Sequence, residues 1–129
     1  MKPIADVNDL QEARSQTRAF IFLYVQWATQ ARLSKLTVEE LPSYWQVEQG
    51  QLPTAAYFAD LSDQTGDVWN GIRDWLQSEG MPVDPLTYGG NGALLWVRDG
   101  RVMEFAGYVD GVALSALKAI TRRVFGETE

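Results

Sequence analysis

The feature that most constrains this chain is a run of seven apolar residues, Ala19–Val25 (AFIFLYV), with polar residues on both sides. Its length suits a strand, and it is apolar at every position rather than at alternate positions. A strand of this kind is covered on both faces, which requires helices above and below a sheet. The run therefore predicts an α/β architecture with Ala19–Val25 as a buried strand.

Helices and strands alternate through the rest of the chain. A capping pattern at Asn8–Gln11 predicts a first helix to about residue 15. The other predicted elements are a helical stretch after Trp27, strand Ala55–Ala59, helix Gly66–Ser78, the hairpin strands Ala93–Arg98 and Arg101–Ala106 joined by Asp99-Gly100, and helix Val112–Phe125. This order predicts one domain over residues 1–129, an α/β sandwich with a mixed sheet.

The helical stretch after Trp27 leaves two alternatives open. Either one helix continues and kinks near Pro42, or a short helix ends and a second begins at the capping box Thr37–Glu40. In the first alternative, Leu33, Leu36 and Leu41 share one face.

Composition excludes several classes of function. A net charge of −6 disfavours nucleic acid as a partner. The chain has no cysteine and no histidine, so it cannot form disulfides, thiolate metal sites or a histidine base, and we expect no metal and no cofactor. No apolar stretch is long enough to span a membrane, and the polar start, MKPIADVNDL, is unlike a signal peptide. We expect a cytoplasmic protein without a membrane partner.

Two polar motifs are better explained by structure than by chemistry. The spacing of Asp60, Asp63 and Asp67 fails the EF-hand pattern, and predicts a strand end followed by a cap from Asp63 or Thr65. The glycine-rich Tyr88–Gly92 lacks the lysine of a phosphate-binding loop. Among five tryptophans, Trp96 and one of Trp69 and Trp75 are predicted core; an exposed indole, or the Tyr44–Trp45 pair, would indicate a partner surface.

The segment after the apolar run, Trp27-Ala-Thr-Gln-Ala-Arg32, resembles the W-C-x-x-C-[KR] motif of thioredoxins. The second half of the chain resembles the same family through an apolar strand after Gly92-Ala93, an Arg98-Asp-Gly100 turn, a second strand, and Gly107 before the last helix. The resemblance extends over roughly Asn8–Phe125. It implies a thioredoxin-like fold with a central mixed sheet.

All departures from the family pattern fall at its reactive surface. Ala28 and Ala31 stand at the two cysteine positions, and Gly92 stands at the position of the cis-proline. Phe22 occupies the place of a buried acid five residues before the motif tryptophan, which is retained as Trp27. The thiolate, its partner and its proton relay are thus absent together.

The resemblance implies a redox-inactive thioredoxin-like domain that binds another protein as an accessory module. The expected contact residues are Trp27, Thr29, Gln30, Tyr88, Gly92 and Tyr108, because these segments converge in the family's substrate groove. One alternative is a thiol-disulfide oxidoreductase whose two cysteines were replaced by Ala28 and Ala31. A third is a subunit that mainly assembles larger complexes.

Overall fold

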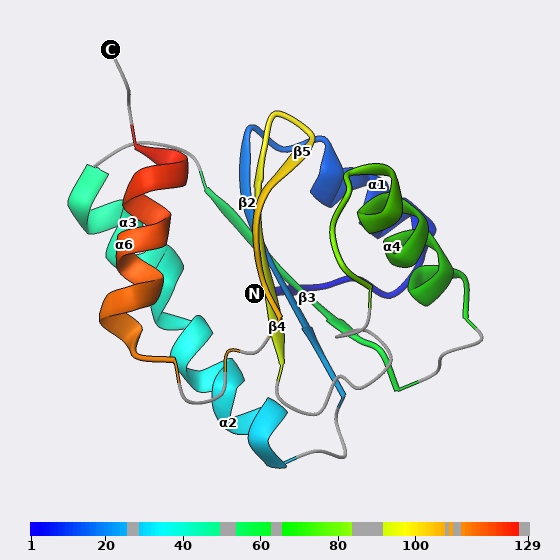
Figure 1. The fold of residues 1–129 in the computed structure, drawn as a ribbon, viewed down its shortest axis with the longest axis horizontal. Coiled ribbons are helices and arrows are strands. Elements are labelled where there is room, and N and C mark those ends of the chain that lie inside the picture. Colours follow the sequence, from blue (N-terminus) through cyan, green and yellow to red (C-terminus); the bar gives the residue numbers. More distant parts are fainter. Residues whose placement is uncertain are drawn as a thin grey trace.

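Five strands form one sheet in the order β1-β3-β2-β4-β5 in the computed structural model of the chain (Figure 1). The structure describes residues 1–25, 29–49, 54–62, 66–83, 92–107, 109 and 112–126, with the backbone alone at 29–33 and 46–49. The strands are β1 (Lys2–Pro3), β2 (Arg18–Tyr24), β3 (Ala55–Asp60), β4 (Ala93–Arg98) and β5 (Arg101–Ala106).

Helices cover both faces of the sheet. They are α1 (Val7–Arg14), α2 (Thr29–Val38), α3 (Glu40–Gln49), α4 (Asp67–Ser78) and α6 (Leu114–Phe125). In Figure 1, α1 and α4 pack together on one side, while α2, α3 and α6 lie on the other. No helix in the described part of the chain is long and apolar enough to cross a membrane.

Strand β2 lies at the centre of the sheet, as its apolar run predicts. It pairs in parallel with β3 and antiparallel with β4, so the sheet is mixed. Every residue of β2 is buried, because helices cover both of its faces. The predicted α/β sandwich with a mixed sheet is confirmed, while the two-residue strand β1 has no signal in the sequence.

The boundary between α2 and α3 matches neither alternative exactly as drawn from the sequence. The helix breaks at Glu39, so Thr37 lies in the last turn of α2, which ends at Val38, rather than capping a second helix, and Pro42 lies in the first turn of α3. A proline ring clashes with the carbonyl four residues earlier, here that of Val38, which accounts for the break. Leu36 is 63% exposed whereas Leu41 is buried, so the predicted shared face is wrong for Leu36.

Two predicted helix caps are also wrong. Helix α1 is capped by Asp6, whose carboxylate accepts a hydrogen bond from the Asp9 N–H (2.9 Å), and not by Asn8. Helix α4 has Gly66 at its N-cap position, which offers no side-chain acceptor. Asn8 lies two residues after the observed cap of α1, and Thr65 lies one residue before that of α4, so the capping patterns gave each helix start only approximately.

The tryptophans divide as the helical periodicity predicts. Trp96 is fully buried and donates to Thr121 Oγ1 (3.0 Å), and Trp75 is buried while its neighbour Trp69 is half-buried. Trp45 is also fully buried, with its ring 6.1 Å from that of Phe125. The prediction that Trp45 belongs to a partner surface is therefore wrong.

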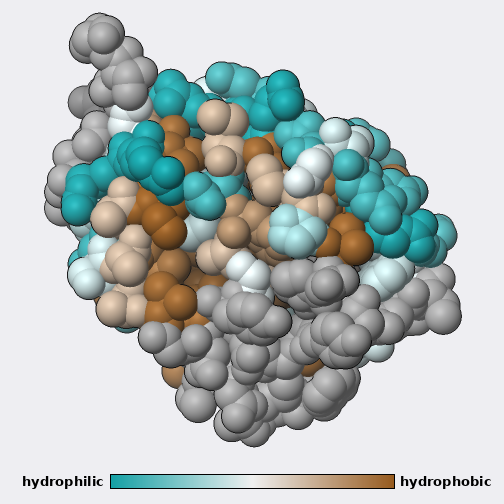
Figure 2. All heavy atoms as spheres, in the orientation of Figure 1, coloured by the Kyte–Doolittle hydropathy of each residue, from teal (hydrophilic) through white to brown (hydrophobic). Residues whose placement is uncertain are grey.

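The β4–β5 hairpin forms with the predicted bounds. Asp99 and Gly100 both have positive φ (53° and 82°), as a two-residue turn of this hand requires. The register shifts between Trp96 and Val97, which leaves Met103 as an extra residue on the edge strand. Figure 2 shows hydrophilic residues along the top and over the α1–α4 side of this face, and apolar residues over part of the opposite helix layer and between the two layers.

Candidate functional site

The degenerate motif lies where β2 ends and α2 begins, and we call this end of the sheet the motif end. It comprises the carboxyl ends of β1, β2 and β3 and the starts of α2 and β4. Of the predicted contact residues, Trp27, Tyr88 and Tyr108 lie outside the described residues, as does Ala28. Thr29, Gln30 and Ala31 belong to the first turn of α2, where the structure describes only the backbone.

Gly92 is the one predicted contact residue that the structure describes completely. It has φ +76°, a conformation that residues with a Cβ rarely adopt. A Cβ added there would lie 2.8 and 2.9 Å from Cε1 and Cζ of the Phe22 ring, and 3.4 Å from Cβ of Ser34. Backbone conformation and crowding therefore both require glycine at this position.

The contact between Phe22 and Gly92 joins two of the departures that the sequence shows separately. Phe22 is fully buried on β2, Ser34 is buried on α2, and Gly92 immediately precedes β4. The aromatic ring thus lies beside the start of β4 and the second turn of the motif helix. The resemblance to thioredoxins implies an acid at position 22 and a proline at position 92, and in this chain a buried aromatic ring and a glycine meet there instead.

Gly92 also joins two loops. Its carbonyl accepts a hydrogen bond from the Val109 N–H (3.0 Å), which ties the chain entering β4 to the chain leaving β5. Val109 is itself buried. The predicted contact residues Tyr88 and Tyr108 belong to these two segments of the sequence.

Aromatic rings continue from Phe22 along the α2 face of the motif end. Phe22 stacks on Tyr24 (centroids 5.7 Å apart), and Tyr24 lies 5.9 Å from Phe58. The Lys35 ammonium lies over Phe58, 4.1 Å from the ring centroid. Burial, with a further contribution from Asp60, raises the pKa of Tyr24, so its hydroxyl does not serve as a base near neutral pH.

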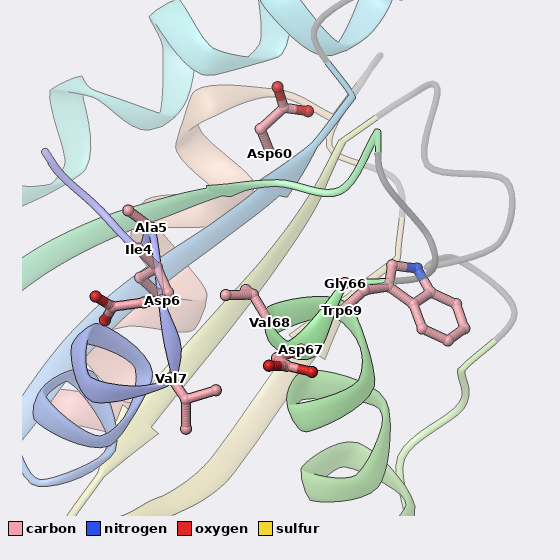
Figure 3. Close-up of a pocket in the computed structure, with 9 residues that line it drawn as sticks. All are labelled: Ile4, Ala5, Asp6, Val7, Asp60, Gly66, Asp67, Val68 and Trp69. Carbon is pink, nitrogen blue, oxygen red and sulfur yellow. The ribbon is translucent and has the colours of Figure 1, made fainter.

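A pocket on the α1–α4 side of the motif end was not predicted from the sequence. Ile4–Val7, Asp60 and Gly66–Trp69 line it, and its volume is about 330 Å³ (Figure 3). It lies between the N-termini of α1 and α4, beyond the carboxyl ends of β1 and β3. The residues are far apart in sequence, and only the exposed-tryptophan argument for Trp69 pointed toward this surface.

The described residues offer little that could perform acid–base or metal chemistry. No group of three acidic side chains in the described part of the chain could hold a metal ion. The pKa of Tyr57 is raised to about 12, chiefly by burial and by its hydrogen bond to Glu12, and this contact fixes α1 against β3. The described part of the motif end therefore offers packed aromatic rings on the α2 side and a pocket on the α1–α4 side.

No protein-family model matches the chain, and no curated protein matches it in sequence. Its structure is similar to a mutant thioredoxin from Halobacterium salinarum NRC-1, with a TM-score of 0.65 and 15% identity over 99% of this chain and 93% of that one. Mitochondrial thioredoxin 3 from Saccharomyces cerevisiae gives a TM-score of 0.63 and 10% identity, over 95% and 94% of the two chains. The thioredoxin of Malassezia sympodialis gives a TM-score of 0.63 and 10% identity, over 96% of this chain and 90% of that one.

Proposed function

Since a thioredoxin fold here carries no cysteine, we propose that the chain is a redox-inactive accessory module that binds another protein at its motif end. The observation that carries this proposal is the Phe22–Gly92 contact. It places an apolar ring and a glycine where the resemblance expects the acid and the proline of a redox centre. This pair supports a motif end that has the recognition role implied by the resemblance without its redox chemistry.

The proposed contact residues are those expected from the resemblance: Trp27, Thr29, Gln30, Tyr88, Gly92 and Tyr108. Tryptophan and tyrosine supply large contact areas in protein interfaces and often dominate their binding energy. The hydrogen bond between Gly92 and Val109 supports the idea that the two tyrosine-bearing segments act together. The partner is another protein, and the setting is the cytoplasm.

Affinity capture with three forms of the chain tests the proposal. Wild type and Leu36→Ser, an exposed change on α2, should retain the same protein, and Trp27→Ala should lose it while keeping a native circular dichroism spectrum. If Trp27→Ala unfolds, the tryptophan is part of the core; if it retains the same protein, the motif end is not the binding surface.

The alternative, an oxidoreductase disabled at two positions, makes a different prediction. Ala28→Cys/Ala31→Cys would restore such an enzyme, whereas we expect the double variant to lack disulfide reductase activity because Phe22 and Gly92 remain. The intact mass of the protein from its natural source decides the same question directly. A mass higher by two sulfur atoms would establish the oxidoreductase.

A further inference from the structure

Three polar side chains meet where α3 and α6 pack side by side on one face of the sheet (Figure 1). Arg122 of α6 donates a hydrogen bond from Nη1 to the hydroxyl of Tyr44 on α3 (2.7 Å). Lys118, one turn earlier on α6, places its ammonium over the Tyr44 ring, 4.7 Å from the centroid. Arg122 is exposed, and Lys118 and Tyr44 are half-buried. We call these three side chains the α3–α6 cluster.

The α3–α6 cluster holds more hydrogen-bond donors than the fold uses. The Tyr44 oxygen already accepts from Arg122, so its own O–H is directed elsewhere, and no acceptor for it lies in the described part of the chain. The Arg122 guanidinium uses one N–H in this bond and keeps the others. The Lys118 ammonium makes no hydrogen bond to any described residue. A group that only accepts hydrogen bonds, such as a carboxylate, complements these donors.

Neither cation of the cluster has a carboxylate partner among the residues that the structure describes. The adjacent Arg123 does have one, since its Nη2 lies 2.6 Å from Glu104 Oε1. The negative end of the α6 dipole favours a cation in the last turn, which accounts for the position of Arg122. It does not account for two cations one turn apart without a described acid partner, in a chain whose net charge is −6.

The surface of α6 beside the cluster carries small side chains. Ser115 lies three positions before Lys118, and both Ser115 and Ala119 are exposed. Ala119 in turn lies three positions before Arg122, so these residues share one side of the helix. The backbone of another chain can therefore approach both cations without displacing a long side chain.

We propose that the α3–α6 cluster binds an acidic segment of a partner protein. One carboxylate of the segment accepts hydrogen bonds from Arg122 and from the Tyr44 hydroxyl, and a second pairs with Lys118. Two cations are too few for a nucleic acid, whose binding needs a row of lysines and arginines along the phosphates. No residue of the cluster belongs to the motif end, so this second contact stands or fails independently of the proposed function.

Titration of the ¹⁵N-labelled full chain with capped hexaglutamate, followed by amide chemical shifts, tests the proposal. Saturating shifts should appear at residues 44, 118, 119 and 122. Capped hexaglutamine, which has the same length without the charge, should bind about tenfold more weakly, because charge-assisted hydrogen bonds account for a difference of that size. Equal affinity for the two peptides, or the absence of saturating shifts at these residues, would overturn the proposal.

Two neighbouring arginines provide a matched pair of variants. Arg122→Gln should weaken hexaglutamate binding about tenfold. Arg123→Gln removes the same charge from the next position of α6, where the guanidinium is already paired with Glu104, and should change binding by less than about twofold. Thermal unfolding verifies that both variants are folded. An equal effect of the two would show that only general electrostatics attract the peptide, and would contradict the proposed site.

Inorganic phosphate distinguishes an acidic segment from a phosphate-bearing ligand. Phosphate presents one anionic group where the segment presents several, so it should bind more weakly than hexaglutamate, with smaller shifts at the same amides. Stronger binding of phosphate than of hexaglutamate would overturn the proposal in favour of a phosphate ligand.

Discussion

The two ends of the sheet are built in different ways. The hairpin end comprises the Asp99–Gly100 turn and the C-termini of α1, α4 and α6. Here charged side chains form hydrogen bonds with backbone groups. Arg18 Nε donates to the carbonyl of Phe125 (3.2 Å), and Arg98 Nη1 donates to that of Val124 (3.0 Å). These carbonyls end α6 and have no partner within the helix.

Glu79 makes a second set of hydrogen bonds at the hairpin end. Its carboxylate accepts from Arg101 Nε (3.0 Å) and from the Val102 N–H (2.9 Å), which ties the end of α4 to the start of β5. At the motif end, by contrast, the close contacts around Gly92 come mainly from the buried Phe22 ring and its stack on Tyr24, beside one backbone hydrogen bond from Val109. Hydrogen bonds from charged side chains dominate the hairpin end, and close packing of a ring on a glycine dominates the surroundings of Gly92. The motif end is therefore the more sensitive to a change in side-chain volume.

The largest effect is expected at Gly92. Gly92→Ala places a Cβ in a left-handed conformation and against the Phe22 ring, and should lower the free energy of unfolding by about 2–4 kcal/mol. Urea denaturation measures it. Phe22→Leu removes the opposing ring atoms, so the double variant should lose at least about 0.5 kcal/mol less than the sum of the two single changes. If the losses of the two single variants simply added, the contact with the Phe22 ring would not be the cause of the destabilisation by Gly92→Ala.

A smaller loss of stability is expected when a hydrogen bond at the hairpin end is removed. Arg18→Met keeps the length of the side chain but leaves the Phe125 carbonyl without its donor, and should cost about 1–3 kcal/mol in chemical denaturation. Arg73→Met, at a partly exposed arginine on α4, is the matched control and should change stability by less than about 0.5 kcal/mol. If Arg73→Met lowered the free energy of unfolding as much as Arg18→Met, the loss at Arg18 would not come specifically from its hydrogen bond to the Phe125 carbonyl.

The acid dependence of stability should come in part from Glu79. Burial alone would raise the pKa of this carboxyl, but hydrogen bonds from Arg101 and the Val102 N–H outweigh burial and lower it below the usual 4.5. Because the folded pKa is the lower one, the contribution is complete above pH 4.5 and is lost as pH falls through the folded pKa. In Glu79→Gln the melting temperature should fall less steeply as the pH drops below 4.5. The loss of stability from this change should be smaller than that from Arg18→Met. An unchanged acid profile would exclude the contribution.

The smallest effect is expected at the exposed Leu36. Leu36→Ser should change the free energy of unfolding by less than about 0.5 kcal/mol, because the side chain is 63% exposed. Leu41→Ser, one helix later and fully buried, is the contrast and should cost several times more. Thermal melts of the two variants measure the difference. Similar melts would show that both leucines occupy equivalent environments.

Sequence patterns predicted the parts of this molecule that local chemistry determines. The apolar run of β2 and the Asp99-Gly100 turn each carry their own signal, and both elements form where predicted. A break before Glu40 was one of two alternatives, but it was attributed to a cap at Thr37, whereas Pro42 causes it through the carbonyl of Val38. The two-residue β1 depends on its pairing with β3.

The candidate site was predicted only in part, for a related reason. The sequence shows Phe22 and Gly92 as separate departures from a family pattern, and their contact, across 70 positions of the chain, appears only in the fold. The pocket brings together Ile4–Val7 and Gly66–Trp69 through the packing of α1 on α4. Cap residues at the two helix starts give no sign in the sequence that they face a common recess.

The extra residue Met103 on β5 limits how this molecule can associate. A strand at the border of a sheet offers unpaired backbone groups along which another chain can add, and a bulge interrupts that row. At the same border, Arg101 and Glu104 add charges of opposite sign. Chains in a concentrated solution should therefore not join edge to edge along β5. A natural partner must approach through loops and side chains rather than by extending the sheet there.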